Sequence, residues 1–464
     1  MQQTSKSPAV GKMWLIPALR GGAACALVGT LLLGCGPRQE QKSPNLTADA
    51  ADGLPHTFAE LNAWYVEPPA QQNAATCLSQ GFGVMQIPNA ASSPLPLLGK
   101  GALPPLGSPM AASMKSTLTA FLHSNRDALQ LFAEGANCQT CRYSLDLTRG
   151  NDAVFPHLPK LRTAVRLLEL SAIVHAESKD GNDAAQDVLT ALGLSRSLEA
   201  EPSTLSQFMR AADVAIAVAA LEQTLNRTVL SRESLGTLMT ALHKMEDYDA
   251  RGEGFNRALV AERVMMAALL ATPQKLLEFL QGAPATDLPA EQRNQIAARL
   301  QAAKDLKEEQ HYLDDTVRQL IAIRQSALPD RLKAVDLVRQ RVAEAVEKKL
   351  MVLVWLLPGF EKQAAQEAGC LASLRLGLTA VALERFRAAH ENRYPDNLAA
   401  LSPDFLGSTP ADPFDGQPLR YRKKGDGYSL YCIGPDLKDN AGERMKENKG
   451  DIVFAVVGPA TQRN

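Results

Sequence analysis

Apolar residues recur at helical spacing through most of this chain. In segment 73–86, for example, Ala74, Leu78, Phe82 and Met85 lie three or four residues apart, which places them on one face of a helix. Pro, Gly and Ser residues separate such segments and mark the helix ends. The pattern predicts helices at 73–86, 113–134, 158–176, 183–198, 203–225, 231–248, 255–282, 290–325, 331–357 and 371–390.

The pattern changes near the carboxyl end. Segment 428–433 alternates apolar and polar side chains, as a half-buried strand does, and segments 418–422 and 451–456 also have the composition of strands. Gly425-Asp426-Gly427 is a turn signal between the first two of these segments. The three segments predict a small three-stranded antiparallel sheet.

Two of the predicted helices, 158–176 and 183–198, are joined by a tight turn at Lys179-Asp180-Gly181-Asn182. This turn looks like one from a tetratricopeptide repeat, but no period of about 34 residues continues along the chain. We therefore expect a mainly α protein, with a domain of helical hairpins at 54–370 and a small α+β module at 371–464.

The amino-terminal segment 1–34 has the order of a secretory signal. Basic residues precede an apolar run at 23–33, which is shorter than the roughly 20 residues that cross a bilayer. The run ends in Leu32-Leu33-Gly34-Cys35, which resembles the lipobox of bacterial lipoproteins. The resemblance implies that Cys35 carries a lipid and that segment 35–53 is a flexible tether. The alternative is an ordinary signal peptide with an incidental cysteine.

A lipid on Cys35 would attach the protein to a membrane of the cell envelope, facing the periplasm. The next residue is Gly36 and not Asp, which slightly favours the outer membrane. The whole chain has 49 Lys and Arg against 50 Asp and Glu, so its formal net charge is −1. This balance lacks the basic surface that nucleic-acid binding needs, so we expect no nucleic-acid partner.

Five of the seven cysteines follow the proposed lipid site, which leaves at least one thiol unpaired within this part of the chain. Cys138 and Cys141 form a C-x-x-C pair that follows a predicted helix, whereas redox-active pairs follow a strand and begin a helix. Zinc would need two more ligands, and no second cysteine or histidine pair supplies them. We interpret Cys138 and Cys141 as a local disulfide or as inert thiols.

Near the carboxyl end, four short motifs follow one another, in segments 393–401, 410–421, 427–431 and 434–436. Together, segment 375–456 resembles the C-terminal module of the major pseudopilins of type II secretion, in which a helix leads through a Pro-rich loop into three strands. Pseudopilins begin with a polymerising hydrophobic helix, and the amino terminus of this chain differs from it. The resemblance therefore implies a reused module and not a pilin subunit.

The same resemblance implies a structural calcium site in the loop 434–451. Asp436, Asp439 and Asp451 occupy the matching region, and Ca²⁺ prefers such hard oxygen ligands. Lysine and arginine residues in the loop nearly balance its acids. The alternative is therefore a solvated polar turn closed by weak ion pairs. We expect no other cofactor.

The remaining sequence suggests no activity. Segments 61–65 and 156–162 resemble those of uncharacterised bacterial lipoproteins, and Trp64-Tyr65 is an aromatic plug or, less simply, a binding platform. The apolar run 350–357 fits a buried helix end or a membrane-surface contact. No nucleophile, phosphate-binding or zinc-protease motif occurs. We predict a non-enzymatic lipoprotein scaffold that binds an envelope protein; the alternatives are an accessory part of a secretion or pilus-like system and a hydrolase with an unrecognised site.

Overall fold

The structure is a computed structural model that describes residues 53–282, 289–303, 305–446 and 449–458. The signal segment 1–34, the proposed lipid site Cys35 and the tether up to residue 52 lie outside the described residues. Within the described part, the predicted fold class is confirmed: the protein is mainly α-helical, with one small antiparallel sheet near the carboxyl end.

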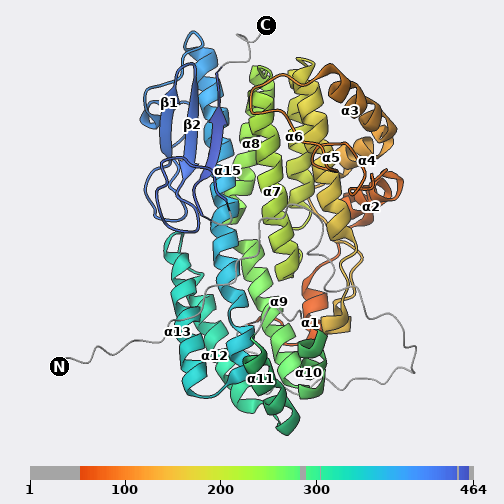
Figure 1. Ribbon diagram of the computed structural model, residues 1–464, viewed down its shortest axis with the longest axis vertical. Helices are drawn as coiled ribbons and strands as arrows, with labels where there is room; N and C mark the ends of the chain where they lie inside the picture. The colour runs from red at the N-terminus through yellow and green to blue at the C-terminus, as the bar shows by residue number, and fades with distance from the viewer. Residues whose placement is uncertain (1–52, 283–288, 304, 447–448, 459–464) are drawn as a thin grey trace, which may run out of the picture.

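Most helices of the amino-terminal half form the upper part of the molecule in Figure 1, whereas the first helix lies in the lower half. The first group lies at one side and comprises α1 (Phe58–Trp64), η2 (Ala70–Gln72), α2 (Ala74–Val84), α3 (Ala112–Ser124), α4 (Arg126–Asn137) and η3 (Leu147–Asp152). The second group stands upright beside it and comprises α5 (His157–Glu177), α6 (Gly181–Arg196), α7 (Thr204–Leu225) and α8 (Arg232–Ala250). The α5–α6 hairpin confirms the predicted pair, with Asp180 capping α6 through the Asp183 N–H.

A second set of helices forms the lower end of the molecule (Figure 1). It comprises α9 (Glu253–Leu270), α10 (Pro273–Gly282), α11 (Ala290–Ala302), α12 (Lys307–Ile323), η4 (Asp330–Leu332), α13 (Lys333–Glu347) and α14 (Met351–Leu356). The long helix α15 (Gly359–Ala389) then runs up through both sets, and η5 (Leu398–Leu401) follows it.

Four predicted helices are each divided into two. The break in 113–134 falls at Asn125, a buried residue whose side chain accepts a hydrogen bond from the Gln86 N–H at 2.8 Å. The break in 255–282 falls before Pro273, which has no N–H to continue a helix. The helix predicted at 290–325 stops at residue 302, and the one at 331–357 is interrupted around Lys349, whose φ is +59°.

Helix α15 runs without interruption through the domain boundary predicted between residues 370 and 371. Two hydrophobic clusters meet along it. Phe360 and Ala364 pack with α9–α14 in the smaller cluster, whereas Ala368 and the residues after it pack with α1–α8 and the sheet in the larger one. The α+β module therefore shares a core with the helices before it.

A layer of buried charges lies where the two clusters meet. Arg210 of α7 is fully buried and pairs with Asp249 of α8 through Nη1 and Nη2 of its guanidinium. In the same layer, Glu367 of α15 pairs with Arg331 and, at 3.0 Å, with Arg324. Buried charges are tolerated only when they are paired in this way. The layer thus fixes α7, α8, α15 and η4 in one arrangement.

The sheet has the predicted antiparallel order β1–β2–β3, formed by β1 (Arg420–Lys424), β2 (Gly427–Cys432) and β3 (Ile452–Val456). All of β2 is buried, and the sheet stands beside the upper half of α15 (Figure 1). Gly427 is required there, because a Cβ at this position would lie 2.0 Å from the Val456 carbonyl oxygen.

One described helix, α7, is long and apolar enough to cross a membrane by length and composition. Its residues pack instead among α5, α6 and α15, and Val214, Ala217 and Leu221 are fully buried. In this structure α7 is the central helix of the larger core.

Candidate functional site

A buried cluster of polar side chains surrounds Glu201, which lies between α6 and α7. Its Oε1 accepts a hydrogen bond from the Ser206 hydroxyl at 2.5 Å and lies 3.1 Å from His157 Nε2. The Tyr65 hydroxyl donates to Oε2 at 3.4 Å. Glu201 and Ser206 are fully buried, and His157 and Tyr65 nearly so. The cluster therefore joins α1, α5 and α7 inside the core.

Aromatic stacking extends this cluster toward the surface. The Tyr143 ring stacks on His157 with 4.0 Å between centroids, and its hydroxyl lies 2.9 Å from Ser197 Oγ. Burial raises the pKa of both Tyr65 and Tyr143 well above the ordinary value, so both hydroxyls stay protonated at physiological pH and serve as donors. Tyr65 is thus the buried plug that one interpretation of Trp64-Tyr65 requires.

Serine, histidine and glutamate are also the residues of hydrolytic triads, so it matters which side chain is hydrogen-bonded to which. A triad needs the serine hydroxyl bonded to the histidine, with the carboxylate behind the histidine. Here Ser206 and His157 both contact the same oxygen of Glu201, and no hydrogen bond joins the two among the described residues. In this cluster the three side chains thus connect core elements, and Ser206 does not have the geometry of a triad serine.

A shallow hollow of about 340 Å³ opens beside Tyr143. Arg142 lies in it with its guanidinium carbon 4.8 Å from the Tyr65 ring centroid. Asn73 fixes the Arg142 backbone from both sides, donating to its carbonyl at 3.0 Å and accepting from its N–H at 2.9 Å. The hollow is polar, and it is lined by Glu67, Asn73, Ala75, Thr76, Ser79, Arg142, Tyr143, Ser144 and Leu145.

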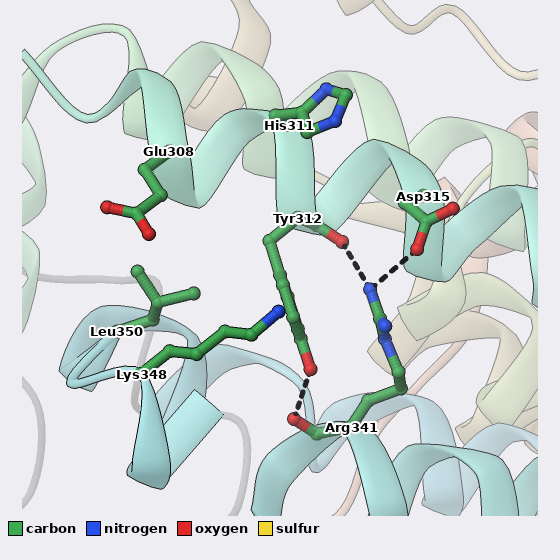
Figure 2. A pocket seen from close by; sticks show the side chains of 7 residues that line it. All are labelled: Glu308, His311, Tyr312, Asp315, Arg341, Lys348 and Leu350. Carbon is green, nitrogen blue, oxygen red and sulfur yellow. Dashed lines mark hydrogen bonds and ion pairs between the residues drawn. The ribbon is translucent and has the colours of Figure 1, made fainter. Parts of the chain in front are cut away.

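A second hollow of about 240 Å³ lies between α12 and the end of α13 (Figure 2). The Tyr312 ring lies between the Arg341 guanidinium at 3.8 Å and the Lys348 amine at 5.0 Å. Arg341 also pairs with Asp315 at 2.8 Å and with Glu344 at 3.1 Å. Arg341 is thus neutralised by two carboxylates, and the hollow keeps charges of both signs in Glu308 and Lys348.

The three aspartates of the predicted calcium loop mainly contact backbone N–H groups. Asp451 is buried and accepts hydrogen bonds from the N–H groups of Asn440 and Gly442, at 3.1 and 2.6 Å. Asp436 accepts from the Gly450 N–H at 3.0 Å, and Asp439 from the Ala441 N–H at 2.8 Å. These bonds connect distant parts of the loop. Calcium binding stays a prediction.

One group of three potential metal-binding side chains does meet within the described residues. His243, Glu246 and Asp247 lie on one face of α8 with ligand atoms within 4.8 Å of one another. Glu246 already pairs with Arg375 at 2.9 Å, and His243 and Asp247 are exposed and pair at 3.3 Å. We interpret the group as surface ion pairs.

Cys138 and Cys141 are free thiols in the structure. Cys141 points into the Glu201 cluster, and burial raises its pKa to about 12. A thiol with so high a pKa is a poor nucleophile. Both interpretations of the Cys138 and Cys141 pair stay predictions.

The two edges of the sheet differ. Side chains of α7 cover the β3 edge: Glu222 accepts from the Ala455 N–H at 2.6 Å, and Asn226 bonds the Ala455 carbonyl at 2.7 Å and the Val457 N–H at 2.9 Å. At the other edge, alternation from the Gly425-Asp426 turn directs the backbone groups of Tyr421 and Lys423 away from β2. None of the described residues hydrogen-bonds those outward groups.

Positive charge accompanies this uncovered edge. Arg422, Lys423 and Lys424 are exposed. Lys423 pairs with Asp396 at 3.0 Å, and Arg420 pairs with Asp412 and Asp415, so Arg422 and Lys424 carry the excess charge. We call residues 420–424, with their outward backbone groups, the β1 edge. It combines unpaired strand hydrogen-bonding groups with excess positive charge.

The chain was compared with family models, curated proteins and solved structures, and none of them matches it. The resemblances to lipoproteins and to pseudopilin modules therefore stay predictions from sequence.

Sequence reasoning missed the Glu201 cluster and the covering of β3. The cluster draws on residues as far apart as Tyr65 and Ser206, and each looks ordinary in its own segment. One signal was present: segments 61–65 and 156–162, both singled out in the sequence, meet at Glu201 through Tyr65 and His157.

Proposed function

We propose that this protein is an envelope-anchored lipoprotein that acts as a non-catalytic scaffold and binds an extended acidic segment of another envelope protein along the β1 edge. The observation that carries the proposal is the contrast between the two edges of the sheet. Helix α7 satisfies the β3 edge, whereas the β1 edge keeps its outward backbone groups uncovered.

An uncovered strand edge binds other strands through its backbone groups, and the side chains select which ones. Like charges opposite each other in paired strands are destabilising. The exposed basic residues Arg422 and Lys424 therefore oppose pairing with the same edge of a second copy and favour a partner strand that carries Asp or Glu.

The interior of the protein supports a scaffold role. The side chains that resemble catalytic residues, around Glu201, are used in bonds between core elements. The two hollows are shallow and polar, unlike the apolar clefts that typically hold small substrates.

The anchor rests on the sequence Leu32-Leu33-Gly34-Cys35. Cys35→Ser is expected to move the protein from the membrane fraction to the soluble fraction with its circular dichroism spectrum unchanged. Membrane attachment that persists in this variant would contradict the lipid assignment.

Partner binding is tested by affinity capture from detergent-solubilised membranes of the native cells. Lys424→Glu reverses one exposed charge on the β1 edge, and Lys362→Glu makes the same change on the exposed side of α15. We expect Lys424→Glu to lose the captured protein, Lys362→Glu to retain it, and raised salt to weaken capture by wild type. Equal capture by both variants would remove the β1 edge from the proposal.

A second candidate is an accessory component of a type II secretion or pilus-like system. The order of elements after α15, a Pro-rich loop and then three antiparallel strands, is the one that the pseudopilin resemblance implies. Normal secretion and pilus assembly in a deletion strain would eliminate this candidate and leave the scaffold proposal untouched.

A further inference from the structure

Helices α2 and α4 pack antiparallel at very short range, because glycines lie in their contact. A Cβ at Gly81 would lie 2.5 Å from the Phe132 ring, and one at Gly135 would lie 2.6 Å from Leu78 and 3.4 Å from the Ala74 carbonyl oxygen. The segment that follows α4 also contacts the start of α2, because the Ala74 N–H donates a hydrogen bond to the Thr140 carbonyl at 3.0 Å. The beginning of α2 therefore lies against the end of α4.

Cys77 and Cys138 occupy equivalent places on these two elements. Each lies three residues after a residue that takes part in the contact, Ala74 on α2 and Gly135 on α4. Three residues turn a helix by about 300°, so both cysteines lie about 60° to the same rotational side of the contact. In an antiparallel pair, equal rotations of this kind place two side chains on the same edge of the interface.

The surroundings of the two thiols agree with this geometry. Cys138 Sγ lies 4.0 Å from the Glu134 carbonyl oxygen, so it points back along α4. Cys77 has its pKa raised by burial and by the nearby Cys138 and Glu134. Both cysteines are half-buried, which leaves them open to reagents.

We propose that Cys77 and Cys138 form a disulfide that ties α2 to the end of α4 when the protein is oxidised. The two thiols lose two protons and two electrons and form one S–S bond. A disulfide oxidant, such as oxidised glutathione or an oxidoreductase disulfide, takes up these protons and electrons and is reduced to two thiols. Oxidising compartments supply such oxidants.

This pairing replaces the local one between Cys138 and Cys141. Cys141 points inward, where Tyr143 contacts it and burial raises its pKa, so its thiolate is scarce. Cys370 and Cys432 are buried elsewhere in the core. Among the described cysteines, Cys77, Cys138 and Cys141 are half-buried, and the contact between α2 and α4 brings Cys77 near Cys138.

Trypsin separates the alternatives cleanly. Cys77 lies in the tryptic peptide Ser43–Lys100, whereas Cys138 and Cys141 share the peptide Asp127–Arg142. The purified full chain is incubated with oxidised glutathione, alkylated, and digested without reductant for mass spectrometry. We expect the two peptides to be joined, and to separate again after reduction.

Matched serine variants identify the cysteine within the second peptide. The joined species should survive in Cys141→Ser and disappear in Cys77→Ser and Cys138→Ser. If Asp127–Arg142 instead appears alone and lighter by two hydrogen atoms, the disulfide is the local one and the proposal is wrong. Full alkylation of both Cys77 and Cys138 after oxidation would equally overturn it. The proposal is independent of partner binding at the β1 edge.

Discussion

The buried charged layer between the two hydrophobic clusters depends on Gly252, the residue that precedes α9. Its φ of +69° lies in the left-handed region, which disfavours residues with a Cβ. A Cβ there would lie 2.3 Å from Arg331 Nη1 and 2.6 Å from Glu367 Oε1. Gly252→Ala therefore strains the backbone and pushes apart the Arg331–Glu367 ion pair.

The expected loss of stability has two parts and one offset. The left-handed conformation costs an alanine about 1 to 2 kcal/mol. A displaced hydrogen bond between charged groups costs about 1.5 to 3 kcal/mol. Alanine also restricts the unfolded chain, which returns about 0.4 to 1 kcal/mol. Together these effects predict that Gly252→Ala lowers the free energy of unfolding by about 2 to 4 kcal/mol.

Gly236→Ala is the matched control. Gly236 lies inside α8, and a Cβ there would meet nothing within 4 Å. Alanine should therefore stabilise the protein there by about 0.5 to 1 kcal/mol. The assay is equilibrium urea denaturation followed by circular dichroism. Equal effects of the two substitutions would refute the view that the charged layer is tightly packed around Gly252.

Two further substitutions test buried charge. Asp249→Ala leaves Arg210 buried without its carboxylate and should lower the free energy of unfolding by about 3 to 5 kcal/mol; a loss under about 1 kcal/mol in urea denaturation would mean that water reaches Arg210. Burial raises the pKa of Glu199 from 4.5 to about 7. Between pH 4.5 and pH 7 the folded state therefore holds a proton that the unfolded state releases. The free energy of unfolding falls as the pH rises through this range. The free energy of unfolding of Glu199→Gln relative to wild type should therefore increase between pH 5 and pH 8, by up to about 3 kcal/mol. If the difference in unfolding free energy between the two proteins does not change with pH, Glu199 is solvated.

The helices were largely predictable because the spacing of apolar residues within each segment defines the buried face of its helix. Where tertiary contacts decided, the predictions erred: Asn125 ends α3 because its side chain is held by Gln86, 39 positions away. Helix α15 was predicted to start too late, because its first turns pack on the smaller cluster, around Phe360, whose existence no local pattern reveals.

The candidate interface was partly predictable. The sequence indicated the three strands, and the Gly425-Asp426 turn set their register. It could not show that Glu222 and Asn226 cover the β3 edge, because α7 lies more than two hundred residues earlier. For the same reason, Cys77 was not paired with Cys138: helical spacing gives the faces of two helices but not which helices meet.

Photo-cross-linking tests the central claim most directly, that the β1 edge binds an envelope protein. A photoreactive amino acid replaces Lys424 on the β1 edge, and in a control replaces Lys362 on α15; both positions are exposed. The proposal predicts a single major adduct from Lys424 in membranes of the native cells, weaker in high salt, and no such adduct from Lys362. The same adducts from both positions, or none from Lys424, would contradict it.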